Sequence, residues 1–168
     1  MKFLAATGGT MRIAGILTDS IVDGDGVRDV IFLQGCKRAC KGCHNPNTWD
    51  LCGGEEVPLE TIVDRLRGTS NCITISGGEP LLQYDELLEL LYLLKQQDVW
   101  LYTGYTFEDI PNYIKLGLLP FVQVIVDGAF EEDKKDSELR FRGSTNQRLI
   151  DLRESMKNGI TILWEENE

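Results

Sequence analysis

Three cysteines lie close together in the stretch FLQGCKRACKGCHNPNTW, at positions Cys36, Cys40 and Cys43. Their spacing is C-x3-C-x2-C, and no fourth cysteine follows at a comparable interval. Thiolates are common ligands of zinc and of iron–sulfur clusters. The set therefore predicts a metal site that is one ligand short, which the chain either completes with another group or leaves open for a ligand.

Three interpretations of this cysteine set compete. A structural zinc site needs four ligands, and His44 could supply the fourth, although adjacent residues seldom converge on one small ion. An electron-carrying [4Fe-4S] cluster needs four cysteines, and only Cys52 follows, in no recognised spacing. The third interpretation is a [4Fe-4S] cluster with three cysteine-bound irons and one iron open to a substrate or cofactor. The short spacing favours it, because it suits a loop wrapped around one compact cluster.

A second motif, TISGGEP, ends a predicted buried strand at residues 74–80. Gly77 and Gly78 allow a close backbone approach, and Glu79 adds a carboxylate. On its own this pattern is typical of a tight turn between a strand and a helix. Downstream of the cysteine set, on the next predicted strand, it favours a site for the ammonium group of an amino-acid ligand.

Strand and helix patterns alternate along most of the chain. Strands are predicted at 11–17, 28–34, 72–76, 99–103, 121–127 and 160–164, and helices at 58–67, 84–97 and 107–116. Strands separated by single helices predict parallel βαβ units, whose functional sites lie at the carboxyl ends of the strands. The 168 residues are too few for a closed barrel of eight units, which takes about 250. We therefore expect an α/β fold, a partial, open βα barrel of about five to six strands.

The composition of the chain argues against two classes of protein, those that bind nucleic acid and those that span a membrane. The chain carries 17 Lys and Arg against 27 Asp and Glu, a net charge of −10, which argues against a nucleic-acid partner. No run approaches the roughly 18 apolar residues of a membrane span. We expect a cytoplasmic protein with no membrane association. Residues 1–10 are predicted to be an N-terminal extension, and residues 11–168 a single domain.

Basic residues lie between the cysteines, at Lys37, Arg38 and Lys41. They are either a solvated loop or a device that lowers thiol pKa values and offsets the charge of a thiolate-bound cluster. The same residues suggest docking of an acidic electron donor such as reduced flavodoxin. The remaining cysteines, Cys52 and Cys72, are predicted to be structural.

The pairing of a C-x3-C-x2-C loop with a GGE turn resembles the radical S-adenosylmethionine (SAM) superfamily. Within it, the chain resembles the glycyl-radical-enzyme activases, and among these the subgroup that acts on anaerobic ribonucleoside-triphosphate reductase. The segments that carry the resemblance are VDGDGVRDVIFLQGC (22–36), CHNPNTWD (43–50), WLYTGYT (100–106), VDGAF (126–130) and RFRGSTNQRLID (140–151). Many superfamily members have an aromatic residue directly before the third cysteine, where this chain has Gly42. Adenine stacking on that side chain is therefore not expected.

The resemblance implies an enzyme with two cofactors, a [4Fe-4S] cluster and SAM. Cys36, Cys40 and Cys43 would ligate the cluster, and the amino and carboxylate groups of SAM would occupy the open iron. The implied SAM contacts are Gly77, Gly78 and Glu79 for the amino group, main chain at Gly42, Cys43 and His44 for the adenine, and Thr103, Gly104 and Asp127 for ribose or carboxylate. One electron would split SAM, and the 5′-deoxyadenosyl radical would take a hydrogen atom from a glycine of the reductase.

Two polar segments have no derivable role. Residues 22–28 (VDGDGVR) are predicted to form a loop, which by resemblance faces the mouth of the active site. Residues 141–148 (FRGSTNQR) are predicted to be a surface loop and, by resemblance, a candidate for docking or cofactor closure. Other functions also stay open: activation of a different glycyl-radical enzyme, radical SAM chemistry on a small molecule, or a non-catalytic iron–sulfur or zinc protein.

Overall fold

One sheet of seven strands organises the residues that the computed structural model describes, 8–66 and 72–165. The strands are β1 Thr10–Ser20, β2 Arg28–Leu33, β3 Glu55–Pro58, β4 Cys72–Gly77, β5 Asp98–Tyr102, β6 Val122–Asp127 and β7 Arg148–Asp151. The α-helices are α1 Leu59–Arg65, α2 Tyr84–Leu93, α3 Asn112–Leu118 and α4 Leu152–Asn158. Short 3-10 helices lie at Pro46–Thr48, Pro80–Gln83, Phe107–Asp109 and Glu132–Lys134.

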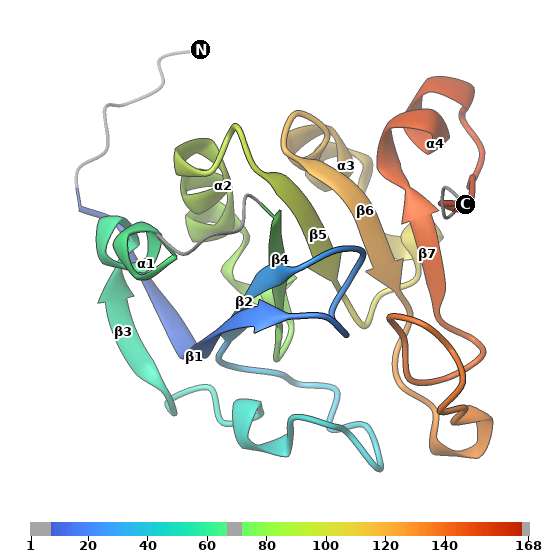
Figure 1. The fold of residues 1–168 in the computed structure, drawn as a ribbon, viewed down its shortest axis with the longest axis horizontal. Coiled ribbons are helices and arrows are strands. Elements are labelled where there is room, and N and C mark those ends of the chain that lie inside the picture. The colour runs from blue at the N-terminus through green and yellow to red at the C-terminus, as the bar shows by residue number, and fades with distance from the viewer. Residues whose placement is uncertain (1–7, 67–71, 166–168) are drawn as a thin grey trace.

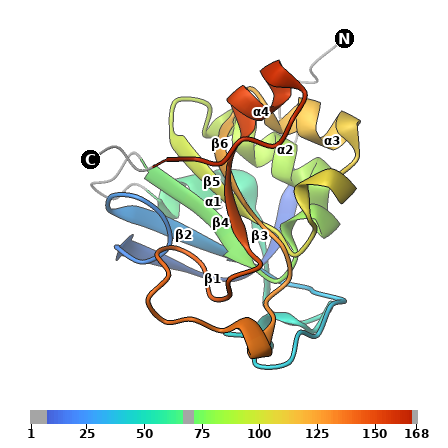
Figure 2. The ribbon, with the colours of Figure 1, turned by 90° about the vertical axis from the view of Figure 1, so that its right-hand side faces the viewer.

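The strands follow the order β3-β1-β2-β4-β5-β6-β7 across the sheet (Figure 1). The central pairs β2–β4, β4–β5 and β5–β6 are parallel, whereas β1 pairs antiparallel with β2 and β3, and β7 with β6. The order ends at β3 and β7, so the sheet is open. The loop after β2, which carries the cysteines, lies at the same end of the sheet as residues 128–147, which follow β6 (Figure 1 and Figure 2).

The two faces of the sheet are covered differently, because successive side chains of a strand point to opposite faces. In β5, Val99 and Leu101 are buried in the main core together with the leucines of α2. Trp100, between them, belongs to a second cluster with Phe141. Figure 2 shows α2, α3 and α4 together on one side of the sheet. The other face is therefore available to the loops at the carboxyl ends of the strands.

Five of the six predicted strands are confirmed, as β1, β2, β4, β5 and β6. The strand predicted at 160–164 is wrong, since within it only Leu163 forms a bridge, to Ile150. The apolar alternation there has another cause: the segment packs along β7, and the Trp164 ring lies 4.9 Å from the Trp100 ring.

The sequence patterns do not predict β3, β7 or α4. Each of these strands has only four residues, too few to display the two-residue period of a strand. The sheet therefore has seven strands instead of the expected five to six.

The helices predicted at 58–67 and 84–97 are confirmed with shorter bounds, as α1 and α2. α1 begins directly after Pro58, and residue 67 of its predicted range lies outside the described residues. The helix predicted at 107–116 is divided: a 3-10 turn ends at Asp109, and α3 begins only after Pro111. A residue before proline is disfavoured in the helical conformation, which accounts for the extended backbone at Ile110.

The amino-terminal boundary lies slightly earlier than predicted. Thr10 already belongs to β1 and pairs with Pro58, and the carbonyl of Gly9 accepts a hydrogen bond from the Leu59 N–H at 3.0 Å. Residues 1–7 of the predicted extension lie outside the described residues. Within the described chain, every helix is too short or too polar to cross a membrane.

Candidate functional site

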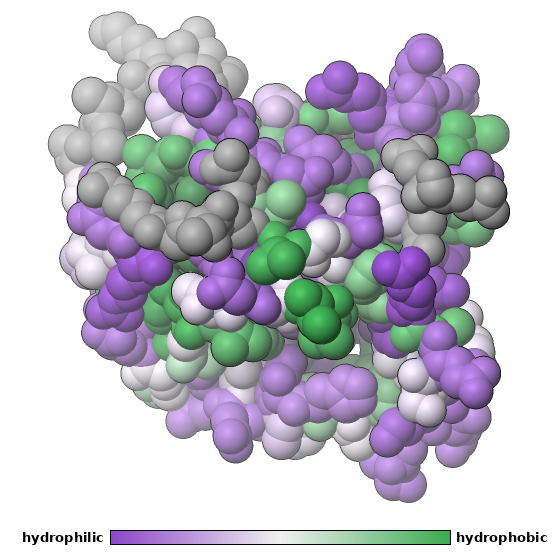
Figure 3. All heavy atoms as spheres, viewed as in Figure 1, coloured by the Kyte–Doolittle hydropathy of each residue, from purple (hydrophilic) through white to green (hydrophobic). Residues whose placement is uncertain are grey.

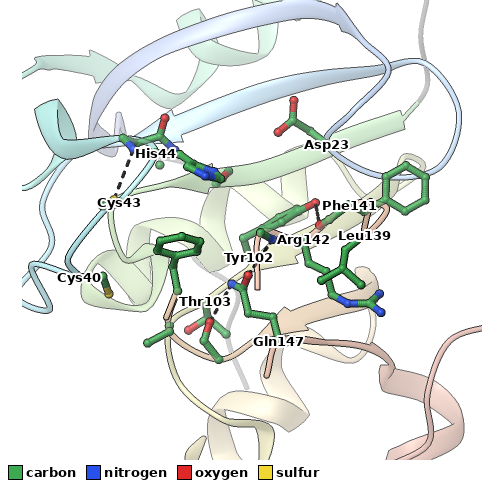
Figure 4. Close-up of a pocket in the computed structure, with 18 of the residues that line it drawn as sticks. Asp23, Cys40, Cys43, His44, Tyr102, Thr103, Leu139, Phe141, Arg142 and Gln147 are labelled. Atoms are coloured by element: carbon green, nitrogen blue, oxygen red, sulfur yellow. Dashed lines mark hydrogen bonds between the residues drawn. The ribbon is translucent and has the colours of Figure 1, made fainter. Parts of the chain in front are cut away.

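A cavity of about 720 Å³ opens at the carboxyl ends of the parallel strands. All three predicted ligands, Cys36, Cys40 and Cys43, line it. Ser76 and Tyr102 line it from the ends of β4 and β5. Figure 4 shows Tyr102 among the residues around this cavity, with Cys40, Cys43 and His44. The fold therefore brings the cysteine loop and the strand ends to one space, as parallel βαβ units predict.

The three thiols influence one another electrostatically. Burial raises the pKa of the Cys40 thiol, and repulsion from the charges of Cys36 and Cys43 raises it further. Arg38 and a hydrogen bond from the Phe130 backbone act in the opposite direction. Among the described residues, no three His, Cys, Asp or Glu side chains converge to hold a single metal ion. All three thiols belong to residues that line the shared cavity.

The GGE turn fixes the start of the cysteine loop. The N–H of Gly78 donates to the Leu33 carbonyl at 2.8 Å, and the N–H of Glu79 donates to the Gly35 carbonyl at 2.8 Å. A Cβ atom at Gly78 would lie 2.2 Å from the Gly35 oxygen, and one at Gly77 would lie 2.3 Å from the Leu33 nitrogen. Both positions therefore require glycine because the backbone leading to Cys36 passes directly over them.

Glu79 is 3% exposed, and burial raises the pKa of its carboxyl group. Its Oε1 accepts hydrogen bonds from the Thr103 hydroxyl at 2.9 Å and the Leu81 N–H at 3.1 Å. Its Oε2 accepts from the Gly104 N–H at 2.8 Å, and Arg38 Nε lies 3.7 Å away. Glu79 thus joins the turn after β4 to the turn after β5 and to the cysteine loop.

Two of the three basic residues between the cysteines have partners within the chain. The Arg38 guanidinium lies over the Tyr105 ring, 4.2 Å from its centroid. Lys41 Nζ lies 2.9 Å from Glu132 Oε2, although the Lys41 side chain is 88% exposed. The loop is therefore not a simple basic patch, because an acidic segment faces part of it.

Most of the predicted site residues are brought together at the cavity. Those that line it are Cys36, Cys40, Cys43, His44, Gly77, Gly78, Glu79, Thr103 and Gly104. Gly42 and Asp127 do not line it. Gly42 faces Phe130 and Glu132, as the contacts of a Cβ at this position show.

Asp127 is 1% exposed, and its carboxylate is already occupied. Oδ2 accepts from the Phe107 N–H at 2.7 Å and from the Arg148 guanidinium, and Oδ1 accepts from the Arg148 N–H at 3.1 Å. Arg148 also binds Glu108, and hydrogen bonds from Arg148 and Thr161 lower the pKa of Glu108 to about 2. These contacts give Asp127 a structural role at the end of β6.

Several residues at the cavity were not predicted. Ser76 and Tyr102 extend the face that carries Thr74 and Trp100, two residues earlier in β4 and β5, so strand alternation was the signal available. Phe130 also lines the cavity; it ends the VDGAF segment, which carried the resemblance but no predicted site role for Phe130. The two segments without a derived role both contribute lining residues: Val22 and Asp23 from the first, and Phe141, Arg142, Gly143 and Gln147 from the second.

Comparison with known proteins agrees with this geometry. Residues 22–150 match a family model described as a 4Fe-4S single cluster domain. The anaerobic ribonucleoside-triphosphate reductase-activating protein of Pasteurella multocida is 36% identical over 141 residues, 76% of this chain and 89% of that protein. The protein of the same name from phage T4 is 37% identical and covers 76% of this chain and 86% of its own length. That of Escherichia coli K12 is 33% identical and covers 79% of this chain and 94% of its own length.

The chain belongs to the family of anaerobic ribonucleoside-triphosphate reductase-activating proteins. Among solved structures, Escherichia coli QueE matches 58% of this chain and 53% of its own, with 24% identity and a TM-score of 0.47.

The cavity of this reductase-activating protein suits a cofactor that several thiolates share. Cys36, Cys40 and Cys43 line one part of it, and the lining also includes the hydroxyl-bearing residues Ser76 and Thr103. The Cys43 sulfur also accepts a hydrogen bond from the Asn45 N–H at 3.4 Å. Hydrogen bonds of this kind tune the reduction potential of an iron–sulfur cluster. The donor set thus fits a [4Fe-4S] cluster with three protein ligands.

Proposed function

We propose that this chain is a radical SAM enzyme that installs a glycyl radical on anaerobic ribonucleoside-triphosphate reductase. The observation that carries the proposal is the meeting of Cys36, Cys40 and Cys43 with the GGE turn at one cavity. Family membership and the matched 4Fe-4S model support the same function. The proposal places the enzyme in the cytoplasm and its activity in one domain, residues 11–168.

We further propose that the open sheet is a partial βα barrel of the radical SAM type. Its parallel centre supports this, and so does the position of α2, α3 and α4 on one side of the sheet, where none of them lines the cavity. In a βα barrel the helices likewise form an outer ring around the strands. The strands that join through antiparallel pairs, β1 with β3 on one side and β7 on the other, would be additions at the two edges of that half-barrel.

Each residue has a proposed role at this site. Cys36, Cys40 and Cys43 would ligate three irons. The main chain at Gly77 and Gly78 would approach the amino group of SAM. Glu79 would hold this turn in place for SAM, since its carboxylate oxygens already accept hydrogen bonds from Thr103 and Gly104. The proposed adenine contacts are Cys43 and His44 at the cavity wall, with Gly42 behind them. Thr103 is the nearer candidate for the ribose, because Asp127 is occupied by Arg148.

The chemistry supplied at the cluster is one-electron cleavage of SAM into methionine and a 5′-deoxyadenosyl radical, which takes a hydrogen atom from a glycine Cα. The chain itself must hold SAM in one orientation and keep water away from the radical. Tyr102 and Phe141 contribute to this wall, since the Tyr102 hydroxyl donates to the Phe141 carbonyl at 2.6 Å. Burial raises the pKa of Tyr102, so its hydroxyl stays protonated and continues to donate.

The partner glycine must enter through the mouth of this cavity. Ile21 and Val22 lie at that mouth, in the β1–β2 hairpin, and are 71% and 69% exposed. Figure 3 shows apolar residues on the surface over this hairpin, in an otherwise largely hydrophilic region. We propose that the glycine-bearing loop of the reductase covers them when it docks.

The decisive test combines SAM cleavage with electron paramagnetic resonance. Under anaerobic, reducing conditions we expect 5′-deoxyadenosine and a glycyl-radical signal on the co-incubated reductase, with no signal on formate-lyase. A signal on formate-lyase alone would indicate a different target. Cleavage of SAM without any protein radical would favour a small-molecule substrate. If no 5′-deoxyadenosine forms, the chain is not a radical SAM enzyme.

We propose an acidic protein such as reduced flavodoxin as the electron donor. Lys37, Arg38 and Lys41 lie on the loop nearest the proposed cluster, although Arg38 and Lys41 have internal partners. Electrostatic steering weakens with ionic strength, so the second-order rate of reduction should fall as salt is raised from about 0.01 to 0.15 M, as the Debye length shortens from about 30 to 8 Å. An unchanged rate would argue against docking at this loop.

A further inference from the structure

Residues 128–147 connect β6 to β7 and contain most of the FRGSTNQR motif, in which the proposed function gives a role to Phe141 alone. We call this segment the strap. Its ends are held together, because Asp127 and Arg148 pair across β6 and β7 and also form an ion pair. The strap lies at the end of the sheet where the cysteine loop lies (Figure 1 and Figure 2). It is thus an anchored loop rather than a free connection.

The side chain of Gln147 holds the strap in shape. Its Oε1 accepts hydrogen bonds from the N–H groups of Gly143 at 2.9 Å and Ser144 at 3.2 Å. Its Nε2 donates to the Gly128 carbonyl at 3.0 Å. Gln147 thus joins the beginning of the strap to its end. Asn146 adds a parallel link, since its Nδ2 donates to the Ala129 carbonyl at 2.8 Å.

A second anchor holds the strap against the sheet. Phe141 has φ 62°, a conformation that is strained for an aromatic residue. Its carbonyl accepts the Tyr102 hydroxyl, and its ring lies 5.4 Å from the Trp100 ring in an edge-on arrangement. Such strain persists only where the surroundings impose one conformation, so the strap has a defined path past the cavity.

The strap contacts the cysteine loop through Phe130 and through Glu132, whose carboxylate pairs with Lys41 at 2.9 Å. The Phe130 ring lies 5.1 Å from the His44 ring. A Cβ atom at Gly42 would lie 3.2 Å from the Phe130 ring, and one at Gly143 would lie 3.1 Å from it. Phe130 is therefore packed between the cysteine loop and the returning half of the strap.

We infer that the strap sets the conformation of the cysteine loop, with Gln147 and Phe130 as positioning residues for Gly42 and His44, on either side of Cys43. Gln147 acts by holding Gly128 and Gly143 in place on either side of Phe130, and Phe130 acts by contact with Gly42 and His44. The inference rests on the proposed function only for naming the cluster that the loop would ligate. It assigns the FRGSTNQR motif to this task.

Hydrogen–deuterium exchange of the full-length protein, measured without oxygen before and after loading with iron and sulfide, tests the inference. In Gln147→Leu and in Phe130→Leu, exchange of residues 36–44 should rise about fivefold or more, as expected for the loss of a net hydrogen bond or equivalent contact. Transfer of iron from the loaded proteins to a chelator should be about tenfold faster, as for other groups that orient metal ligands.

Gln123→Leu is the matched control. Gln123 Oε1 accepts the Val99 N–H near the amino end of β6, whereas the strap follows its carboxyl end, so this variant also loses one glutamine-to-backbone interaction but leaves the strap intact. It should leave exchange of residues 36–44 unchanged. Phe130→Leu keeps every side-chain hydrogen bond within the strap. It therefore tests the inference by itself if Gln147→Leu does not fold.

Two results would overturn the inference. In the first, exchange rises in the strap while residues 36–44 match the unmodified protein. In the second, exchange rises equally in α2, which would show general destabilisation. Because exchange is also measured before iron is added, failure to form a cluster would count against the proposed function and not against the strap.

Discussion

Replacement of Cys36, Cys40 or Cys43 by alanine is expected to reduce SAM cleavage to background, a loss of more than about 100-fold. Changes to groups that merely orient a metal ligand already cost about 10–100-fold, and loss of a ligand should cost more. Iron and sulfide content after anaerobic reconstitution should fall together with the production of 5′-deoxyadenosine. All three positions line the same cavity, so the three variants should behave alike.

The matched control for these variants is Cys52→Ala. Cys52 is exposed and does not line the cavity, and its N–H donates to Asp50 Oδ1 through the backbone, which alanine keeps. This variant should retain iron and SAM cleavage. Full activity in Cys40→Ala, or loss of the cluster in Cys52→Ala, would show that the ligands are wrongly assigned.

Gly78→Ala is expected to disturb the cysteine loop and not only the binding of SAM. The new Cβ would lie 2.2 Å from the Gly35 oxygen and 2.7 Å from the Gly35 carbonyl carbon, so the backbone that leads into Cys36 must move. Overpacking of this kind costs about 1–3 kcal/mol. For a chain of this size that lowers the thermal unfolding midpoint by about 3–10 °C. Iron incorporation should fall in parallel.

Gly15→Ala provides the comparison, because a Cβ at Gly15 would meet nothing within 4 Å. Neither Gly15 nor Gly78 has a positive φ, so the two variants differ mainly in steric space. Gly15→Ala should change neither the unfolding midpoint nor the iron content appreciably. If Gly78→Ala kept its iron and lost only SAM affinity, the contact with Gly35 would not be what requires glycine there.

Much of the fold was predictable, because the central strands and α2 carry strong periodic patterns. The edges were not. β3 and β7 are too short to show a period, and the apolar alternation at 160–164 reflects packing of Trp164 on Trp100 rather than strand pairing. The start of α3 depended on Pro111, whose effect on the preceding residue outweighed the helical pattern.

The residues of the candidate site were also predictable only in part. Spacing alone singled out the cysteines, because ligands on one short loop are close in space whatever the rest of the chain does. Gly77 and Gly78 were also singled out, but for a different reason: the sequence suggested room for a ligand, and the structure shows room for the backbone at Leu33 and Gly35. Asp127 was singled out by the resemblance alone; it is the last residue of β6, and Arg148, distant in sequence, occupies its carboxylate.

The sequence by itself determined the chemistry that the chain offers: three thiols on one loop, a glycine-rich turn after a buried strand, and an alternation of strands and helices. Only the tertiary structure decided which distant groups meet that loop. Phe130, Gln147 and Tyr102 come from other strand ends, and their contacts depend on how the parallel strands align. Local spacing encodes contacts within a loop, whereas contacts between loops depend on the packing of the whole sheet.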